Sequence, residues 1–197
     1  MTQKNFILIG RSGCGKGTQG KLLMEYLKKI DSSREVMYVQ TGGEFRKFID
    51  GDSITQRNSK KIMDEGGLQP EFLAVYIWAN FFINNYKGNE NIIFDGTPRK
   101  LYEAKILDSI WNFYKINYPT IIYLDVNKKW SVDKLLARGR VDDTEKDIEE
   151  RLSWFETDVF PTVEYYKNNL AYKFIEINGE QEIEKVWQEL ESKLKTI

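Results

Sequence analysis

The segment 10–19, GRSGCGKGTQ, combines several glycines with one lysine and the single cysteine of the chain. It follows an apolar run, 6–9, that predicts a buried strand, and it leads into residues 16–30, whose apolar side chains recur at helical spacing. In such a setting, glycines let successive backbone N–H groups point at phosphate oxygens, while the helix N-terminus and Lys16 add positive charge. The spacing of Gly10, Gly15 and Lys16 therefore predicts a phosphate-binding loop.

Two positions in this loop bear on how it could work. Gly17 stands where such loops usually place the Ser or Thr that binds Mg²⁺, and Thr18 comes one residue later. We therefore expect nucleotide phosphates and water to hold Mg²⁺, with Asp95 positioning some of that water. Cys14 has no resolving cysteine, so we interpret it as a small loop residue. A reactive thiol in an electropositive loop is the alternative.

The composition excludes several other kinds of chemistry. The 197 residues contain no histidine and one cysteine, which excludes Ser-His-Asp and Cys-His nucleophiles and an internal disulfide, and argues against the usual zinc sites. With 29 basic and 30 acidic residues the net charge is −1, so no basic excess marks a nucleic-acid-binding protein. The apolar runs are too short for a signal peptide or a membrane span. We expect a cytoplasmic protein that binds neither nucleic acid nor membrane.

Strands and helices are predicted to alternate along the chain. Apolar runs indicate strands at 6–9, 36–39, 91–94, 120–126 and 172–177. Helical patterns cover 16–30, 101–114, 130–137, 144–169 and 180–194, with shorter polar helices between 43 and 67. Pro70 opens a further helix that is apolar nearly all round, and we expect it to be largely buried. The alternation predicts an α/β fold in one domain, a doubly wound five-stranded parallel sheet with helices on both faces.

Five further segments follow the loop in order: QTGGEFRKF (40–48), GGLQPEF (66–72), IIFDGTPR (92–99), RGRVDD (138–143) and IEERLSWF (148–155). With these segments the chain resembles adenylate kinase and the wider nucleoside monophosphate kinase family over essentially its whole length. The resemblance implies a P-loop NTPase-type sheet and Mg²⁺-dependent transfer of the γ-phosphate of ATP to a nucleoside monophosphate. It implies a core of residues 1–40, 70–137 and 144–197, a flap at 41–69 that binds the monophosphate, and a very short lid at 138–143. Pro98 matches a family proline that is usually cis.

Phosphoryl transfer between two nucleotides brings two polyanions together, and arginine suits that task because it is always charged and its fork pairs with two oxygens. The resemblance implies catalytic roles for Lys16, Arg99, Arg138, Arg140 and Arg151, and a Mg²⁺ role for Asp95 through water. The implied ATP-binding residues are Gly10, Ser12, Gly13, Cys14, Gly15, Lys16, Gly17, Thr18, Lys134, Arg138 and Gly179. The implied residues for the nucleoside monophosphate are Thr41, Gly42, Arg46, Leu68, Gln69, Gly96, Arg99, Glu103, Arg140 and Arg151.

The choice of acceptor base depends on a departure from the family pattern. Adenylate-specific members usually have Gln at the position of Glu103, and an ionised carboxylate accepts hydrogen bonds but donates none. Guanine, with two adjacent donors, would suit Glu103 better, whereas Thr41 matches a threonine associated with AMP. We expect AMP as the acceptor, with GMP, or UMP or CMP, as alternatives. Glu103 could also lie off the base and pair with a cation such as Lys100.

Two further expectations concern the donor base and the assembly. Lys134 stands where the family commonly has an arginine that stacks on the donor base, and lysine stacks less well, so donor selectivity is expected to be loose. Balanced charge and the lack of an obvious exposed apolar helix face make a monomer the default. A nucleotide-binding regulator without turnover is the alternative from a different functional class.

Overall fold

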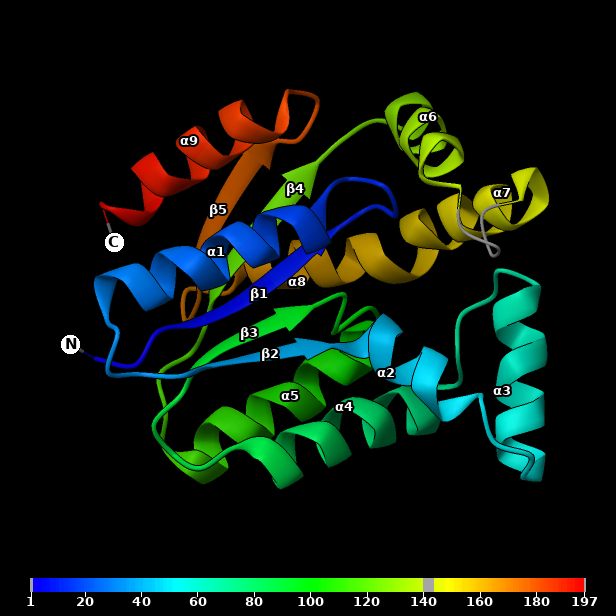
Figure 1. Ribbon diagram of the computed structural model, residues 1–197, viewed down its shortest axis with the longest axis horizontal. Helices are drawn as coiled ribbons and strands as arrows, with labels where there is room; N and C mark the ends of the chain where they lie inside the picture. Colours follow the sequence, from blue (N-terminus) through cyan, green and yellow to red (C-terminus); the bar gives the residue numbers. More distant parts are fainter. Residues whose placement is uncertain (1, 140–143, 197) are drawn as a thin grey trace.

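The computed structural model describes residues 2–139 and 144–196, and strands and helices alternate along them (Figure 1). The strands are β1 (Asn5–Gly10), β2 (Val36–Gln40), β3 (Asn91–Asp95), β4 (Thr120–Asp125) and β5 (Lys173–Asn178). The helices before β4 are α1 (Lys16–Ile30), α2 (Thr41–Phe48), α3 (Ile54–Asp64), α4 (Glu71–Asn85) and α5 (Leu101–Tyr114). Those after it are α6 (Lys128–Arg138), α7 (Glu145–Trp154), the π-helical turn η1 (Phe155–Val159), α8 (Phe160–Asn168) and α9 (Ile183–Leu194). Arg140 and the rest of the predicted lid between 140 and 143 lie outside the described residues.

The strands form one parallel sheet in the order β2-β3-β1-β4-β5, which confirms the predicted fold class. In the central strand β1, Ile7 pairs with Phe94 of β3 and with Ile121 of β4. Successive side chains of a strand point to opposite faces, and both faces of a parallel sheet are covered by helices. The unbroken apolar run of β1 is therefore buried throughout.

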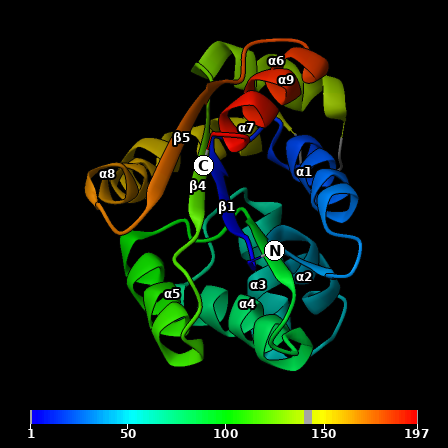
Figure 2. The same cartoon turned by 90° about the vertical axis from the view of Figure 1, so that its left-hand side faces the viewer.

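Helices cover the sheet on both sides, and each side has its own apolar core. Helices α1 and α9 lie on one face, where Leu23 and Leu190 pack with Leu8 of β1. Helices α4, α5 and α8 lie on the other, where Trp78 and Trp111 join the cluster that contains Ile7. Figure 2 shows α1 and α9 on one side of the sheet and α5 and α8 on the other. The two cores hold the carboxyl ends of the strands in fixed positions.

Helix α4 corrects one prediction. Although the helix is apolar nearly all round, Phe72, Tyr76 and Ile83 are 70%, 55% and 63% exposed. The side that contains Trp78 and Phe82 packs against the sheet and its neighbours, and Leu73 and Ile77 pack on Phe45 of α2, whereas the side that contains Phe72, Tyr76 and Ile83 has no element over it among the described residues. The absence of an exposed apolar helix face, one of the two grounds for expecting a monomer, therefore does not hold. No helix of the described residues, α4 included, has both the length and the apolar character to cross a membrane.

Candidate active site

A cavity of about 790 Å³ lies at the carboxyl edge of the sheet. The phosphate loop, the start of α2 and the turn before α5 meet there because they follow the adjacent parallel strands β1, β2 and β3. Figure 1 shows α6 and α7 beyond the same edge. The predicted site residues that line the cavity are Ser12, Gly13, Cys14, Gly15, Lys16, Gly17, Thr18, Thr41, Gly42, Arg46, Leu68, Gln69, Asp95, Gly96, Arg99, Glu103, Lys134, Arg138, Arg151 and Gly179. Gly10 lines a smaller adjoining cavity, and Arg140 lies outside the described residues.

Lys16, the first residue of α1, folds back over the phosphate loop. Its Nζ donates hydrogen bonds of 2.8 Å to the carbonyl oxygens of Gly10 and Arg11 and lies 3.4 Å from the sulfur of Cys14. Gly15 precedes it as the N-cap in the left-handed region, with φ of 95°. The ammonium group is thus held over the loop backbone, from which a rotation of the flexible side chain can move it to a phosphate oxygen. Cys14 is buried, which favours its interpretation as a small packing residue.

Gly13 sets the distance between the loop and α6. Its φ is +85°, and a Cβ at this position would lie 2.9 Å from the carbonyl oxygen of Ser131 and 3.0 Å from Cγ of Leu135. Glycine is the residue that meets both conditions, because it has no Cβ and tolerates positive φ. Helix α6 therefore packs directly on the loop and carries Lys134 and Arg138 to the cavity wall.

Arg11 joins the phosphate loop to the turn η1. Its Nε donates to the carbonyl oxygen of Val126 at 2.9 Å, and its terminal nitrogen lies 2.5 Å from Oε1 of Glu156. The guanidinium carbon lies 4.2 Å from the ring centre of Phe155. The sequence gives no local signal for a role of Arg11, because its partners come from distant parts of the chain. These contacts hold the loop against the helical segment that carries Arg151.

Asp95, at the end of β3, is oriented by the neighbouring strand β2. Its Oδ2 accepts hydrogen bonds from the hydroxyl of Tyr38 at 2.8 Å and from Nε2 of Gln40 at 3.3 Å. A Cβ on Gly17 would lie 3.7 Å from the same oxygen, so the loop passes close to the carboxylate. A Cβ on Gly20 would lie 2.5 Å from the Tyr38 hydroxyl, so this position must lack a side chain. The carboxylate therefore sits in a fixed orientation beside the loop.

Arg99 lies among charged groups that come from four segments. Burial lowers its pKa, Glu103 and Asp95 oppose that shift, and Arg151 and Arg46 add to it by repulsion. Its Nε donates to the carbonyl oxygen of Gly96 at 3.2 Å. Arginine keeps its charge even when partly desolvated. Arg99 therefore interacts with two carboxylates and two further guanidinium groups, and forked guanidinium groups in one cavity suit the binding of a phosphate.

Glu103 occupies the wall of the cavity near Arg99. It is 3% exposed, and its Oε2 accepts a hydrogen bond of 3.2 Å from the backbone N–H of Arg99. Burial raises the pKa of this carboxyl, and the hydrogen bonds and positive charges around it act in the opposite direction. The ammonium of Lys100 instead contacts Glu71 at 3.1 Å. Glu103 is therefore held by the backbone at the start of α5 while it still lines the cavity.

The flap segment 41–69 is tied to the core at its start and is held together internally at its end. At its start, the hydroxyls of Thr41 and Thr97 lie 2.6 Å apart, and both residues are buried. At its end, the side chain of Gln69 accepts a hydrogen bond from the hydroxyl of Ser59 at 3.0 Å and donates one to its carbonyl oxygen at 2.9 Å. The peptide bond between Thr97 and Pro98 is cis, as the resemblance implies. Gln69 thus fixes α3 relative to the end of the flap.

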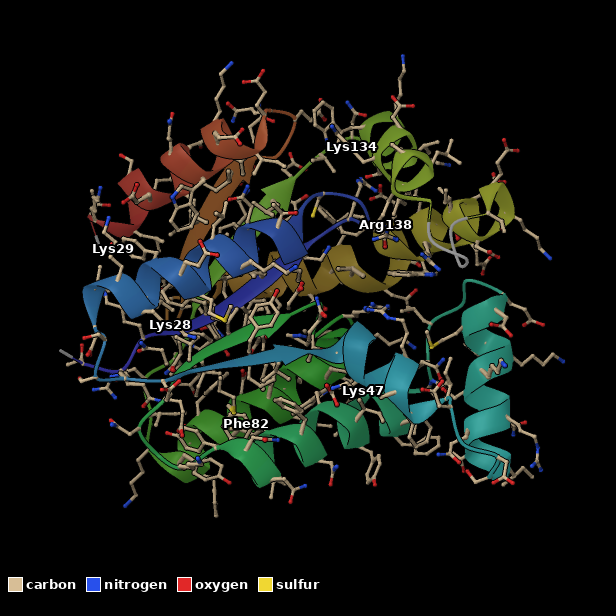
Figure 3. All side chains as sticks on the ribbon, viewed as in Figure 1. Lys28, Lys29, Lys47, Phe82, Lys134 and Arg138 are labelled. Atoms are coloured by element: carbon tan, nitrogen blue, oxygen red, sulfur yellow. The ribbon has the colours of Figure 1, made fainter. Side chains whose placement is uncertain are left out.

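The side of the cavity near α6 contains an aromatic residue, Trp130, that is not among the predicted site residues. Lys134 and Arg138 project from α6 (Figure 3), and Nζ of Lys134 lies 4.6 Å from the ring centre of Trp130. Gly179 closes this side, where its N–H donates to the carbonyl oxygen of Asp125 at 2.8 Å and a Cβ would lie 2.6 Å from Cγ1 of Val126. A flat apolar surface and a cation therefore lie together where a donor base is expected.

The sheet, the phosphate loop after its first strand and the arginines across one cavity define a P-loop nucleotide-binding protein. A family model described as adenylate kinase matches residues 8–171. The adenylate kinase of Prochlorococcus marinus (strain MIT 9515) is 33% identical over 180 residues, which cover 90% of this chain and 92% of that protein. Those of Oenococcus oeni (strain ATCC BAA-331 / PSU-1) and Bacteroides fragilis (strain YCH46) are 31% and 30% identical and cover 90% and 94% of this chain, and 91% and 95% of their own length. The chain belongs to the adenylate kinase family and is an adenylate kinase-like nucleoside monophosphate kinase.

Several residues that line the cavity are not among those predicted from the sequence motifs. Gln40, Trp130 and Trp154 line the cavity but stand outside the residue types that the motifs select. A local signal did exist for two of them, because Trp130 is one helical turn before Lys134 and Trp154 is three residues after Arg151, so each shares a helix face with a predicted site residue. The binding roles of all these residues stay predictions.

Proposed function

We propose that this protein transfers the γ-phosphate of Mg²⁺-bound ATP to AMP and forms two molecules of ADP. The observation that carries the proposal is the cluster of Arg99 with Arg46, Arg151 and Asp95, in the same cavity as Lys16 of the phosphate loop. A loop for one nucleotide and an arginine cluster for a second anion are what a reaction between two phosphorylated substrates requires. The curated relatives, named adenylate kinases, support AMP as the acceptor.

The reaction needs positioning and charge balance more than it needs proton transfer. An oxygen of the AMP phosphate forms a bond to the γ-phosphorus while the bond from that phosphorus to the β–γ bridging oxygen breaks. Arg46 and Arg99 would hold the AMP phosphate in line, and Lys16 would follow the charge on the β- and γ-phosphates. Arg138 and Arg151 would balance the charge on the transferring group from the α6 and α7 side. Arg140 is expected to join them on the ground of the resemblance.

The described residues fit a Mg²⁺ ion that is held mainly by the nucleotide. They contain no group of three or more carboxylate, histidine or cysteine side chains that could form a protein cage. Asp95 offers one oriented carboxylate beside Gly17. This donor set suits Mg²⁺, which keeps several waters and takes further oxygens from phosphates. When bound, the ion supplies positive charge to the phosphates, and Asp95 would hold its water.

The acceptor base is proposed to lie beside Glu103 and the pair Thr41 and Thr97. Glu103 keeps a carboxyl group at the cavity wall, and its buried position favours the protonated form, which can both donate and accept. A protonated carboxyl would match the N1 acceptor and the amino donor of adenine. The ionised form would match the two adjacent donors of guanine, so GMP is the second candidate acceptor.

The contacts within the flap indicate which residues would move together. We infer that residues 41–69 close over the acceptor as one unit, because Gln69 ties α3 to the end of the flap. The lid at 138–143 is short enough that its closure would be a small loop movement. Closure of this kind excludes water and prevents simple hydrolysis of ATP.

A coupled assay tests the proposal with purified protein, ATP, Mg²⁺ and each of AMP, GMP, CMP and UMP. We expect ADP formation with AMP as the best acceptor. Lys16→Ala should reduce kcat/KM by about 100-fold or more, the scale of losing one charge-stabilising donor. Lys28→Ala is the matched control, because Lys28 is exposed at the other end of α1 (Figure 3) and should change little. If none of the four nucleotides is phosphorylated, the kinase proposal is wrong.

A further inference from the structure

Trp154, the last residue of α7, contacts two segments that are far from it in the sequence. Its Nε1–H donates a hydrogen bond of 3.2 Å to the carbonyl oxygen of Gly66, near the end of the flap. Its ring centre lies 5.2 Å from the guanidinium carbon of Arg99, which follows β3. Its side chain also lines the main cavity. One indole therefore joins α7, the flap and a predicted phosphate-binding arginine.

The backbone around Gly66 gives a second, independent indication that the flap rests on α7. Gly66 has φ of +71°, and a Cβ there would lie 2.8 Å from the carbonyl oxygen of Asp147 and 2.9 Å from its Cα. The N–H of Gly66 donates to the carbonyl oxygen of Met63 at 3.1 Å, and that of Gly67 to Ile62 at 2.9 Å. Any displacement of Gly66 relative to α7 is thus passed to the end of α3.

The contact of the Trp154 ring with Arg99 offsets the repulsion of Arg99 by two other arginines. Arg46 and Arg151 repel the guanidinium of Arg99. The hydrogen bond from its Nε to the carbonyl oxygen of Gly96 leaves the orientation of the guanidinium plane to other contacts. The face of an indole attracts a guanidinium placed within about 6 Å of the ring centre. Trp154 supplies that attraction from α7, the helix that also carries Arg151.

We propose that Trp154 is a positioning residue that couples closure of the flap to the orientation of Arg99. The indole N–H holds the flap at Gly66, and the indole face holds the guanidinium where the acceptor phosphate binds. The inference rests on the proposed function, because it takes Arg99 as a ligand of that phosphate. The two contacts use different parts of one side chain, so two substitutions separate them.

Trp154→Phe keeps an aromatic face for Arg99 and removes the N–H. We expect KM for AMP to rise about 3- to 10-fold, the scale of losing one hydrogen bond, while kcat stays within about twofold and KM for ATP is unchanged. Trp154→Leu removes the face as well, so kcat should fall about 10-fold in addition. Trp187→Phe is the matched control, because Trp187 packs on Tyr26 outside the cavity and its loss should leave all three constants unchanged.

Amide hydrogen exchange tests the link to the flap without substrate turnover. We expect the amides of α3 to exchange faster in Trp154→Phe than in the unmodified protein, whereas Trp187→Phe should not change them. Unchanged α3 exchange, or an equal loss of kcat in the Phe and Leu variants without an increase in KM, would overturn the inference. A protein that phosphorylates no nucleoside monophosphate would contradict the proposed function, and the exchange comparison would still decide whether Trp154 holds the flap.

Discussion

The hydroxyl of Tyr38 donates a hydrogen bond of 2.8 Å to Oδ2 of Asp95 across the neighbouring strands β2 and β3. Burial and the carboxylate together raise the pKa of Tyr38, so the phenol keeps its proton at neutral pH. The bond therefore helps to fix the orientation of Asp95 at neutral pH. The glycine at position 20 leaves room for the hydroxyl to reach that oxygen.

Removal of this hydroxyl should weaken the use of Mg²⁺. In Tyr38→Phe, Asp95 loses its shorter hydrogen bond and can rotate away from the water it is proposed to hold. We expect the Mg²⁺ concentration for half-maximal activity to rise about 10-fold, the lower end of the effect of losing a group that orients a metal-binding side chain. A Mg²⁺ titration of the coupled assay measures this. Tyr26→Phe serves as the control, because Tyr26 packs on Trp187 outside the cavity. An unchanged Mg²⁺ requirement in Tyr38→Phe would mean that Tyr38 does not support the proposed role of Asp95.

Glu103 should make the choice of base depend on pH. Burial raises the pKa of its carboxyl, so the group gives up its proton at higher pH than an exposed glutamate does. As pH rises through that pKa, the form that suits adenine gives way to the form that suits guanine. We expect the ratio of kcat/KM for AMP to that for GMP to fall as pH increases between 5 and 8. The phosphates of AMP and GMP titrate alike, so their titration changes both kcat/KM values equally and cancels in the ratio.

The variant Glu103→Gln provides the control for this pH effect. Its amide donates and accepts at every pH, so the AMP to GMP ratio should be about 10-fold higher near pH 8 than in the unmodified protein and nearly independent of pH. The amide oxygen can still accept the N–H of Arg99, which preserves the start of α5. An identical ratio in the two proteins would mean that residue 103 does not touch the base.

The sheet and the phosphate loop could be predicted from the sequence because both depend on local patterns. The apolar run of β1 and the glycines at 10, 13 and 15 specify a buried strand and a loop without reference to the rest of the chain. Burial of α4 could not be predicted in the same way, because its apolar residues surround the helix and only the neighbouring elements decide which side is covered. Phe72 and Trp78 have similar hydrophobicity but opposite environments.

In the candidate site, too, local patterns could be predicted from the sequence, whereas contacts between distant segments could not. Motifs select Lys16, Asp95 and Arg99 because their residue types and spacing carry the chemistry. The contacts that orient them come from other strands and helices, as Tyr38 does for Asp95 and Trp154 does for Arg99. A tyrosine in a strand or a tryptophan in a helix is usually a core residue, so residue type does not select these two, although Trp154 shares a helix face with Arg151.

Arg11 and Glu156 should contribute unequally to stability. The carboxylate of Glu156 is 57% exposed, and an ion pair at the surface contributes little, so Glu156→Ala should lower the free energy of unfolding by about 0.5 kcal/mol or less. Arg11 also binds the carbonyl oxygen of Val126 and covers the ring of Phe155, so Arg11→Ala should cost about 1–3 kcal/mol. Urea denaturation measures both variants, and equal losses would show that the ion pair dominates.

Gly13→Ala should damage the phosphate loop more than its backbone conformation alone explains. The new Cβ would meet the carbonyl oxygen of Ser131 at 2.9 Å, and a backbone atom cannot move aside as a flexible side chain can. Gly88→Ala is the matched control, because Gly88 also has positive φ, at +102°, but a Cβ there would have no atom within 4 Å among the described residues. We expect Gly88→Ala to lower the free energy of unfolding by about 1–2 kcal/mol from strain alone, and Gly13→Ala to lower it by about 1–3 kcal/mol more because of the clash.

Because relief of the clash moves α6 away from the loop, Gly13→Ala should also weaken ATP binding, measured by calorimetry, while Gly88→Ala should not. Equal destabilisation by the two substitutions, with unchanged ATP binding, would contradict the close packing of α6 on the loop.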